Sequence, residues 1–350
     1  MDTEYSIADS KIYWTWRKET SAIAMELIET AIQKYKGDSH LYALVKSLVK
    51  RRKHRPSTRA AMVRCAFESV SSADWKKVAP LAAASELEML SLYHLNHLLD
   101  HKGGELYGSL DEKIVAAGLT RGVATELFVN SIKNHAEAGL LIYDFERIDI
   151  AVHEGWYVDL LQLNWDALSL SENDFMTLYE KRCELMNGEL FAISSSMATK
   201  IAGASDEDQA DFRQIGKYYG IINQMVNDIG DFVPPEQSGE TVGKLADDAY
   251  SDLYNGRLTL PIFLAWNKGS RRTKELINKA QNNNFHLSDA MELTKCMIKD
   301  GVFTDCRSVI SDYAKKADLH KRKFSKESFI ENIFLMAEGN RYFSIIENIK

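Results

Sequence analysis

The chain has 350 residues, of which 45% are hydrophobic and 27% are charged, and its formal net charge is −7. This composition provides enough apolar side chains for a substantial core and excludes a disordered protein. The negative charge argues against a nucleic-acid partner. Only 5 prolines occur, and helix formers such as Ala, Leu, Glu and Lys are frequent, so we predict an all-α protein.

The N-terminal sequence and the cysteines indicate the compartment. The first residues are acidic and lack the apolar core of a signal peptide. No run of about 18 apolar residues occurs, so we expect no membrane span. The four cysteines are dispersed, without the paired spacing of zinc sites, and we expect free thiols in a cytoplasmic protein. They are Cys65, Cys183, Cys296 and Cys306.

Helical patterns follow one another along the chain. The predicted helices are 19–36, 40–50, 57–70, 75–100, 121–137, 144–167, 172–202, 206–231, 244–254, 258–268, 272–282, 287–299, 303–324 and 328–347. Glycine-rich 101–108 and the Pro/Gly-containing segment 233–243 are predicted loops. Alternating strand patterns and internal repeats are nearly absent. We therefore expect one domain over 1–350, with N-terminal helices in 1–50, a core in about 50–265 and C-terminal helices in 266–350.

Two predicted helices carry oxygen-bearing side chains one turn apart on one face. The first contains "NHLLD", with Asn96 and Asp100 opposite a leucine face. The second contains "NDIGD", in which Asn227, Asp228 and Asp231 span about 100° of arc. Such oxygen ligands suit Mg²⁺, which is usually held by one or two carboxylates together with phosphate oxygens of a substrate. The alternative is an ordinary solvated helix face.

Three histidines near the first segment suggest a second metal hypothesis. His97 and His101 lie one helical turn apart, as zinc ligands often do, and His94 precedes them. However, Leu98 follows His97 where a zinc protease carries its catalytic Glu. Polar lining of a cavity, or solvation, explains these residues better than zinc.

Basic residues accompany the acidic segments. "KRRKHRP" at 50–56 concentrates positive charge before a helix, and Lys244 and Arg257 follow the second acidic segment. Lys meets phosphate oxygens as a point charge and Arg as a fork. Acids that hold Mg²⁺, followed by bases, suit the departure of diphosphate from carbon, because both neutralise the developing negative charge.

At this point the sequence resembles the trans-isoprenyl diphosphate synthase family, which includes farnesyl and geranylgeranyl diphosphate synthases. "NDIGD" at 227–231 matches the family's second aspartate-rich motif DDxxD, with Gln224 in the usual preceding place. Gly243-Lys244 and "DLYNGRLTLP" match the elements that follow that motif. "RRKHRP" keeps Lys53 and Arg55 of an early basic element. "EGWYVDLL" keeps an aspartate at Asp159, with Trp156 in place of Gln.

The sequence also departs from the family pattern. The first DDxxD falls on "NHLLD", where Asn96 and His97 replace two acids and Asp100 remains. The histidine that helps to bind isopentenyl diphosphate falls on Met89, and a Lys-Thr pair falls near Met186-Asn187. The resemblance therefore implies that the allylic half of the site is partly preserved and the isopentenyl half is eroded.

The resemblance implies an all-α helical bundle of the class I terpenoid synthase type around a central cavity, and three hypotheses for its function. The first is a terpene synthase that ionises an allylic prenyl diphosphate without an isopentenyl acceptor. The second, an alternative that retention of Lys53 and Arg55 favours, is a prenyltransferase. Loss of two acids in the first motif favours a third, a non-catalytic partner subunit of an active synthase. Cavity aromatics that would stabilise cations through their ring faces are Tyr93, Trp156, Tyr157 and Phe191.

The resemblance also implies the residues of the site, a prenyl diphosphate substrate and a homodimer. The metal is expected to be Mg²⁺, with Mn²⁺ as the alternative. The catalytic metal ligands are Asp100, Asn227, Asp228 and Asp231. The substrate-binding residues are Asn96, His97, Lys53, Arg55, Gln224, Lys244, Arg257, Tyr93 and Trp156.

Overall fold

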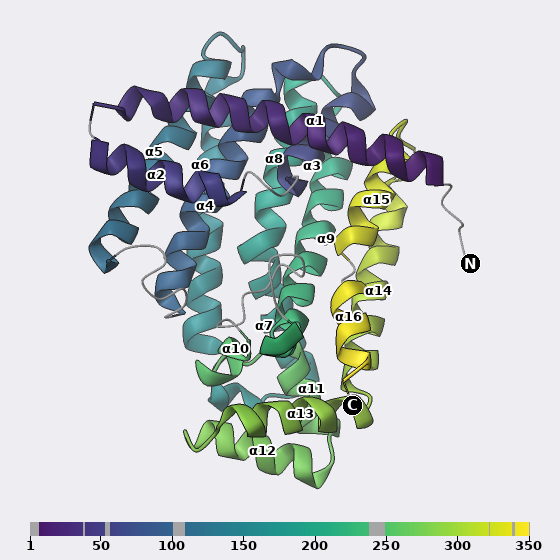
Figure 1. Cartoon of the computed structure of the whole chain (residues 1–350). Helices are drawn as coiled ribbons and strands as arrows, with labels where there is room; N and C mark the ends of the chain where they lie inside the picture. Colours follow the sequence, from purple (N-terminus) through teal and green to yellow (C-terminus); the bar gives the residue numbers. More distant parts are fainter. Residues whose placement is uncertain are drawn as a thin grey trace.

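The structure is a computed structural model, and it describes residues 7–37, 39–52, 57–100, 109–237, 249–321, 323–337 and 340–349. The described residues contain helices and no strand, which confirms the predicted all-α class (Figure 1). The helices are α1 (Ile7–Ile32), α2 (Ser39–Arg52), α3 (Thr58–Val70), α4 (Ala79–Leu99), α5 (Leu110–Ile132), α6 (Ala138–Tyr157), α7 (Glu172–Cys183), α8 (Glu189–Ile201), α9 (Asp206–Gly230), α10 (Ser251–Tyr254), α11 (Leu260–Lys268), α12 (Arg271–Gln281), α13 (Leu287–Lys299), α14 (Val302–Lys321), α15 (Glu327–Ala337) and α16 (Asn340–Glu347).

Helix α5 begins eleven residues earlier than predicted, at Leu110 instead of 121. Ser109 caps it by accepting a hydrogen bond from the backbone N–H of Glu112, whose side chain in turn accepts one from the backbone N–H of Ser109. This reciprocal capping box satisfies two N–H groups that would otherwise lack partners. Helix α1 likewise begins at Ile7, well before the predicted start at 19.

Two predicted long helices are interrupted. The segment predicted as 144–167 ends its α-helix at Tyr157 and continues as one π-helical turn, η4 (Val158–Gln162). The segment predicted as 172–202 is divided by a second π-helical turn, η6 (Glu184–Gly188). Such turns insert one residue and change the direction of the side chains that follow, and they are frequent at functional sites.

The long helices form a bundle. Helix α4 packs along α5, α8 packs along α9, and α9 also packs against α14. Figure 1 shows α1 crossing one end of the bundle and α12 and α13 lying at the other end. The short helix α10 lies toward the α12–α13 end. This arrangement leaves α9 in the middle, with neighbours on several sides.

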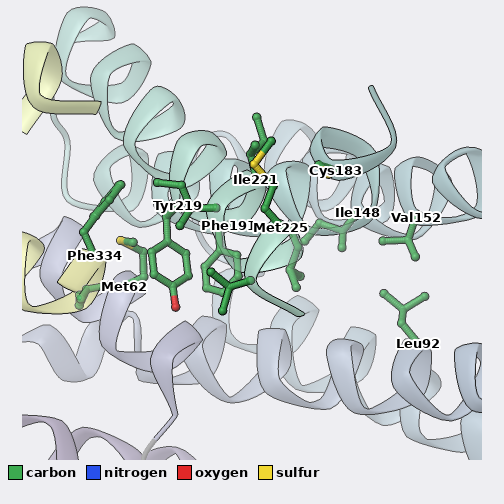
Figure 2. Packing of buried hydrophobic residues seen from close by; sticks show 14 of the residues in the cluster. Met62, Leu92, Ile148, Val152, Cys183, Phe191, Tyr219, Ile221, Met225 and Phe334 are labelled. Carbon is green, nitrogen blue, oxygen red and sulfur yellow. The ribbon is translucent and has the colours of Figure 1, made fainter. Parts of the chain in front are cut away.

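Helix α9 contributes one apolar face to the core. Tyr219 and Met225 of this helix are almost fully buried, as are Leu92 of α4 and Val152 of α6. Figure 2 shows these side chains directed into one packed layer between the helices. Burying a large apolar side chain contributes about 1.5 to 3 kcal/mol relative to leaving it exposed. The apolar face of α9 therefore fixes the rotation of this helix, and with it the positions of its polar residues.

Close packing of α9 on its neighbour depends on a glycine. A Cβ atom at Gly220 would lie 2.4 Å from the carbonyl oxygen of Asn187 in η6. Because no side chain fits there, the backbone of α9 lies directly against η6. Gln224, one turn further along α9, thereby comes next to Asn187.

The described part of the chain has no helix long and apolar enough to cross a membrane.

Candidate functional site

The two acidic segments predicted from the sequence lie close to the same short segment of chain. Asn255 follows α10, and its Nδ2 donates a hydrogen bond of 2.9 Å to the backbone carbonyl of Asp100, at the C-terminal end of α4. Five residues earlier, the backbone N–H of Tyr250 donates one of 2.7 Å to the carbonyl of Asp231, at the end of α9. Segment 250–255 therefore joins the ends of both helices.

A row of alternating charges also connects the two segments. Arg257 Nη2 lies 3.7 Å from Asp100 Oδ1, and Arg257 Nε lies 3.5 Å from Asp159 Oδ2. Arg182 Nε then donates a 2.5 Å hydrogen bond to the other oxygen of Asp159. Arg182 Nη1 donates one of 2.6 Å to Asp228 Oδ2. These five residues, Asp100, Arg257, Asp159, Arg182 and Asp228, are called the charge row below.

Asp159 enters the charge row from the π-helical turn η4 at the end of α6. Its side chain is buried between the two arginines. The chain leaves η4 at Leu163, whose carbonyl accepts a 2.7 Å hydrogen bond from the backbone N–H of Leu258. This bond fixes the segment that carries Arg257 beside the turn that carries Asp159.

Asp228 is enclosed by donors from the protein itself. Its Oδ2 accepts hydrogen bonds from the hydroxyl of Tyr179 at 2.5 Å and from Arg182. Its Oδ1 accepts one of 2.9 Å from Gln224, whose own Oε1 accepts a hydrogen bond from Asn187. Burial raises the pKa of Asp228 to about 6, while the positive charge of Arg182 acts in the opposite direction.

The two arginines of the charge row differ in how closely they contact their acids. Burial opposes the charge of Arg182, but Asp159 and Asp228 more than offset it and hold the pKa of this guanidinium well above its ordinary value. The contacts of Arg257 with its acids exceed hydrogen-bond length, and its buried Nε donates no hydrogen bond to any described residue. Arg257 is therefore the more available cation of the two.

Asp231 serves as an anchor for α10. Its Oδ1 accepts hydrogen bonds from the backbone N–H and the hydroxyl of Ser251, at 3.2 and 2.9 Å. Its Oδ2 accepts one of 3.1 Å from the backbone N–H of Asp252. Because the first N–H groups of a helix lack partners within the helix, this carboxylate stabilises the start of α10.

The donor set at the second segment does not fit the predicted metal site. Asp228 and Asp231 are each 1% exposed, and their oxygens already accept hydrogen bonds from the protein. Asn227 is exposed, but it offers a neutral amide. The searched residues hold no group of three His, Cys, Asp or Glu side chains that could bind a metal ion. The assignment of Asp228 and Asp231 as metal ligands stays a prediction, and their contacts argue against it.

In the first segment Asn96 is half-buried and Asp100 is buried. Asn96 Nδ2 donates a 2.9 Å hydrogen bond to Asp100 Oδ2, so these two predicted residues do face one another. Tyr93 is half-buried one turn earlier, and His94 is buried beside it. The side chain of His97 lies outside the described residues, as do His101 and the predicted basic residues Lys53, Arg55 and Lys244.

The predicted aromatics divide into buried and exposed residues. Phe191 is buried, with the guanidinium of Arg59 5.3 Å from its ring centroid. Trp156 is buried and meets the ring of His153 edge-on. The prediction that Tyr157 lines the cavity is wrong, because this side chain is 57% exposed. It lies at the end of α6, on the outer face of this helix.

Sequence reasoning missed Arg182 and Tyr179. Both lie on α7, in the spacing Phe175, Tyr179, Arg182 and Cys183, which places the arginine on the apolar face. A cation on a face that otherwise faces the core needs a buried acid as partner. That pattern was the available signal, although it does not identify which acid is the partner.

Comparison with known proteins identifies the family that this chain matches. The family model described as polyprenyl synthetase matches residues 113–297. The octaprenyl diphosphate synthase of Escherichia coli (strain K12) is 28% identical over 138 residues, which are 39% of this chain and 39% of that protein. The geranylgeranyl diphosphate synthase of Sulfolobus acidocaldarius is 24% identical over 206 residues, 58% of this chain and 59% of that protein. The matches thus span about two to three fifths of these curated relatives.

Solved structures agree over nearly the whole chain. A polyprenyl synthase from Caulobacter crescentus CB15, complexed with calcium and isoprenyl diphosphate, superposes with a TM-score of 0.76 at 21% identity, covering 97% of each chain. A geranylgeranyl pyrophosphate synthase from Lactobacillus brevis gives a TM-score of 0.73 at 17% identity, covering 93% of this chain and 99% of that one. The predicted isoprenoid synthase fold is thereby confirmed. Since the family model spans more than half of the residues, the chain belongs to the polyprenyl synthetase family.

Proposed function

We propose that the chain is a prenyltransferase that joins an allylic prenyl diphosphate to an acceptor and releases diphosphate. Membership of the polyprenyl synthetase family supports this proposal, as do the named activities of its relatives. They favour the prenyltransferase alternative over the terpene synthase that was the first hypothesis from the sequence. We further propose that 1–350 acts as a single domain and that the enzyme works in the cytoplasm.

The observation that carries the proposal is the position of Arg257. This guanidinium lies between Asp100 of the first acidic segment and Asp159 of η4, and it makes short hydrogen bonds to neither. A planar guanidinium binds phosphate through two parallel hydrogen bonds. A diphosphate group that enters here can therefore take over the donors of Arg257 without breaking a strong internal contact.

In the proposed reaction the bond between C1 and the diphosphate oxygen breaks, and the electron pair leaves with the diphosphate. The allylic cation that remains forms a bond to the acceptor, which then loses a proton. Arg257 would neutralise charge on the departing diphosphate, which is where the transition state differs most from the substrate. Lys53, Arg55 and Lys244 are proposed as further diphosphate contacts. After release of diphosphate, Asp100 and Asp159 are available to hold Arg257 again.

Mg²⁺ is the proposed cofactor, with Mn²⁺ as the alternative. Its ligands would be the carboxylate of Asp100, the amide oxygens of Asn96 and Asn227, and oxygens of the diphosphate itself, since Mg²⁺ commonly binds through few protein ligands. When bound, the ion would supply further neutralisation of the leaving group. The structure of the Caulobacter relative was determined with calcium and isoprenyl diphosphate, which supports the proposal of a divalent ion for this chain.

A homodimer is proposed through an apolar stripe on α6. Five large apolar side chains on this helix and η4 are 46 to 63% exposed, and their spacing of three, four or seven residues places them on one face. They are Leu140, Tyr143, Ile150, Tyr157 and Leu161. A stripe of this length on a helix surface suits packing against the same stripe of a second copy.

The product assay tests the function directly. The protein is incubated with geranyl, farnesyl or geranylgeranyl diphosphate and Mg²⁺, with and without isopentenyl diphosphate, and the products are identified by mass spectrometry. A longer prenyl diphosphate that forms only with isopentenyl diphosphate supports the proposal. A hydrocarbon or alcohol that forms without it would instead establish the terpene synthase.

A non-catalytic subunit is the second candidate, because Asp228 and Asp231 are committed to internal contacts. It predicts no turnover of any allylic diphosphate by the protein alone. It also predicts that addition of this chain raises the activity of a separate prenyl diphosphate synthase. Turnover by the isolated protein would rule it out.

A further inference from the structure

A buried cation, the guanidinium of Arg182 on α7, already contacts Asp228 of the second acidic segment. We propose that the guanidinium of Arg182 fills the cation position at Asp228, so that this carboxylate binds no divalent metal ion in the native protein. Asp228 and Arg182 are then positioning residues of the charge row. This inference concerns metal binding alone, and it stands or falls independently of whether the protein turns over a prenyl diphosphate.

The geometry at Asp228 supports this proposal. Arg182 Nη1 lies 2.6 Å from Oδ2, which is the length of a strong charge-assisted hydrogen bond. The hydroxyl of Tyr179 donates to the same oxygen, and Gln224 donates to the other. A metal ion that approached Asp228 would therefore find both lone pairs of Oδ2 and one of Oδ1 already in use, in a place that solvent does not reach.

The position of Arg182 itself also supports the proposal. The guanidinium is 4% exposed, and Asp159 holds it from the other side at 2.5 Å. On α7 it lies next to the buried side chains of Tyr179 and Cys183. Arg182 is therefore held between two acids and largely out of contact with water, unlike an exposed arginine.

Arg257, in the same charge row, contacts its acids much less closely than Arg182 does. Arg257 meets its two acids at 3.5 and 3.7 Å, whereas Arg182 meets its two at 2.5 and 2.6 Å. The row therefore consists of a tight buried half around Arg182 and a loose half around Arg257. Substrate anions and their metal ions would contact the half around Arg257. The half around Arg182 holds Arg257 in place through Asp159, which both arginines contact.

The experiment counts Mn²⁺ ions bound to the full-length protein. The electron paramagnetic resonance signal of free Mn²⁺ is followed while Mn²⁺ alone is titrated into the native protein and three variants, Asp228→Asn, Arg182→Met and the double variant Arg182→Met/Asp228→Asn. We expect Asp228→Asn to bind as many Mn²⁺ ions as the native protein, with affinities within twofold. We expect Arg182→Met to bind one additional ion, or to bind Mn²⁺ at least fivefold more tightly, and the double variant to lose this gain.

Two results would overturn the proposal. One is the loss of a Mn²⁺ site, or tenfold weaker binding, in Asp228→Asn, because the carboxylate would then be a metal ligand beside Arg182. The other is no gain in Arg182→Met. Circular dichroism verifies the fold of each variant. The double variant removes one positive and one negative charge together. If either single variant does not fold, Mn²⁺ binding by the double variant is compared with that of the native protein. Equal binding supports the proposal, and loss of a Mn²⁺ site contradicts it.

Discussion

Replacing Glu88 by glutamine should stabilise the protein more at pH 7 than at pH 5. Glu88 lies on α4 and is 1% exposed, and neither of its oxygens accepts a hydrogen bond from the described part of the chain. Its cationic neighbour Arg121, 3.5 Å away, also pairs with Glu146 and Asp149. Burial raises the pKa of Glu88 to about 8 against the pull of Arg121, and the two other acids add to the rise.

The magnitude follows from the difference between the folded and unfolded pKa values. Unfolded Glu88 titrates near its ordinary value of 4.5, so between about pH 4.5 and pH 8 the folded chain binds a proton that the unfolded chain has lost. The free energy of unfolding therefore falls as the pH rises through this window. At about 1.4 kcal/mol per pKa unit, the cost is about 1 kcal/mol at pH 5 and about 3 kcal/mol at pH 7.

Glutamine stays neutral and keeps the shape, so Glu88→Gln removes this pH-dependent cost. Its stability relative to the native protein should rise by about 2 to 3 kcal/mol between pH 5 and pH 7. For a chain of 350 residues, with an unfolding entropy of about 2.1 cal/mol/K per residue, this is a relative gain of about 3 °C in Tm.

Thermal unfolding followed by circular dichroism at pH 5, 6, 7 and 8 measures the difference. Glu154→Gln, at an exposed position on α6, is the control and should show no such trend. If Glu88→Gln behaves like the control, or loses stability relative to the native protein as the pH rises, then Glu88 is ionised in the folded protein and the reasoning is wrong.

Three further predictions concern packing, anchoring and assembly. Gly220→Ala should lower the free energy of unfolding, measured in urea, by about 1 to 3 kcal/mol, because its Cβ would overlap Asn187. The control Gly122→Ala, in open space on α5, should raise it by about 0.5 to 1 kcal/mol. Equal effects of the two substitutions would contradict the close approach of α9 to η6. Asp231→Ala should lower the free energy of unfolding by about 2 to 4 kcal/mol, because it removes three hydrogen bonds that hold the start of α10. A loss below about 1 kcal/mol would show that Asp231 is not an important anchor for α10. Leu140→Glu should convert the proposed dimer to a monomer in sedimentation velocity, and an unchanged dimer would place the interface elsewhere.

The sequence was sufficient for the helical architecture and for the identity of the acidic segments. Helical periodicity placed Asn96 beside Asp100, and the two residues are indeed hydrogen-bonded. Periodicity gives the face of a helix but not the helix that packs against it. It placed Asp228 and Asp231 on one face with Asn227, but it did not show that both carboxylates are buried against donors from distant parts of the chain.

The remaining differences have local causes that a periodic pattern does not contain. The π-helical turn η4 interrupts the helix predicted as 144–167 directly after the exposed Tyr157, and it carries the buried Asp159. Arg182 was missed because its partners, Asp159 and Asp228, lie 23 and 46 residues away in the sequence. A pairing of that kind is fixed by the fold and not by the spacing of neighbouring residues.

Calorimetric titration of inorganic diphosphate tests most directly whether the two acidic segments converge on a diphosphate site at Arg257. The native protein and Arg257→Gln are compared with Arg271→Gln, which removes an exposed arginine on α12. A hydrogen-bonded charge pair contributes about 1.5 to 3 kcal/mol, so Arg257→Gln should weaken binding by about 10-fold to 100-fold. Arg271→Gln should bind like the native protein. Equal affinities for all three proteins would contradict the account.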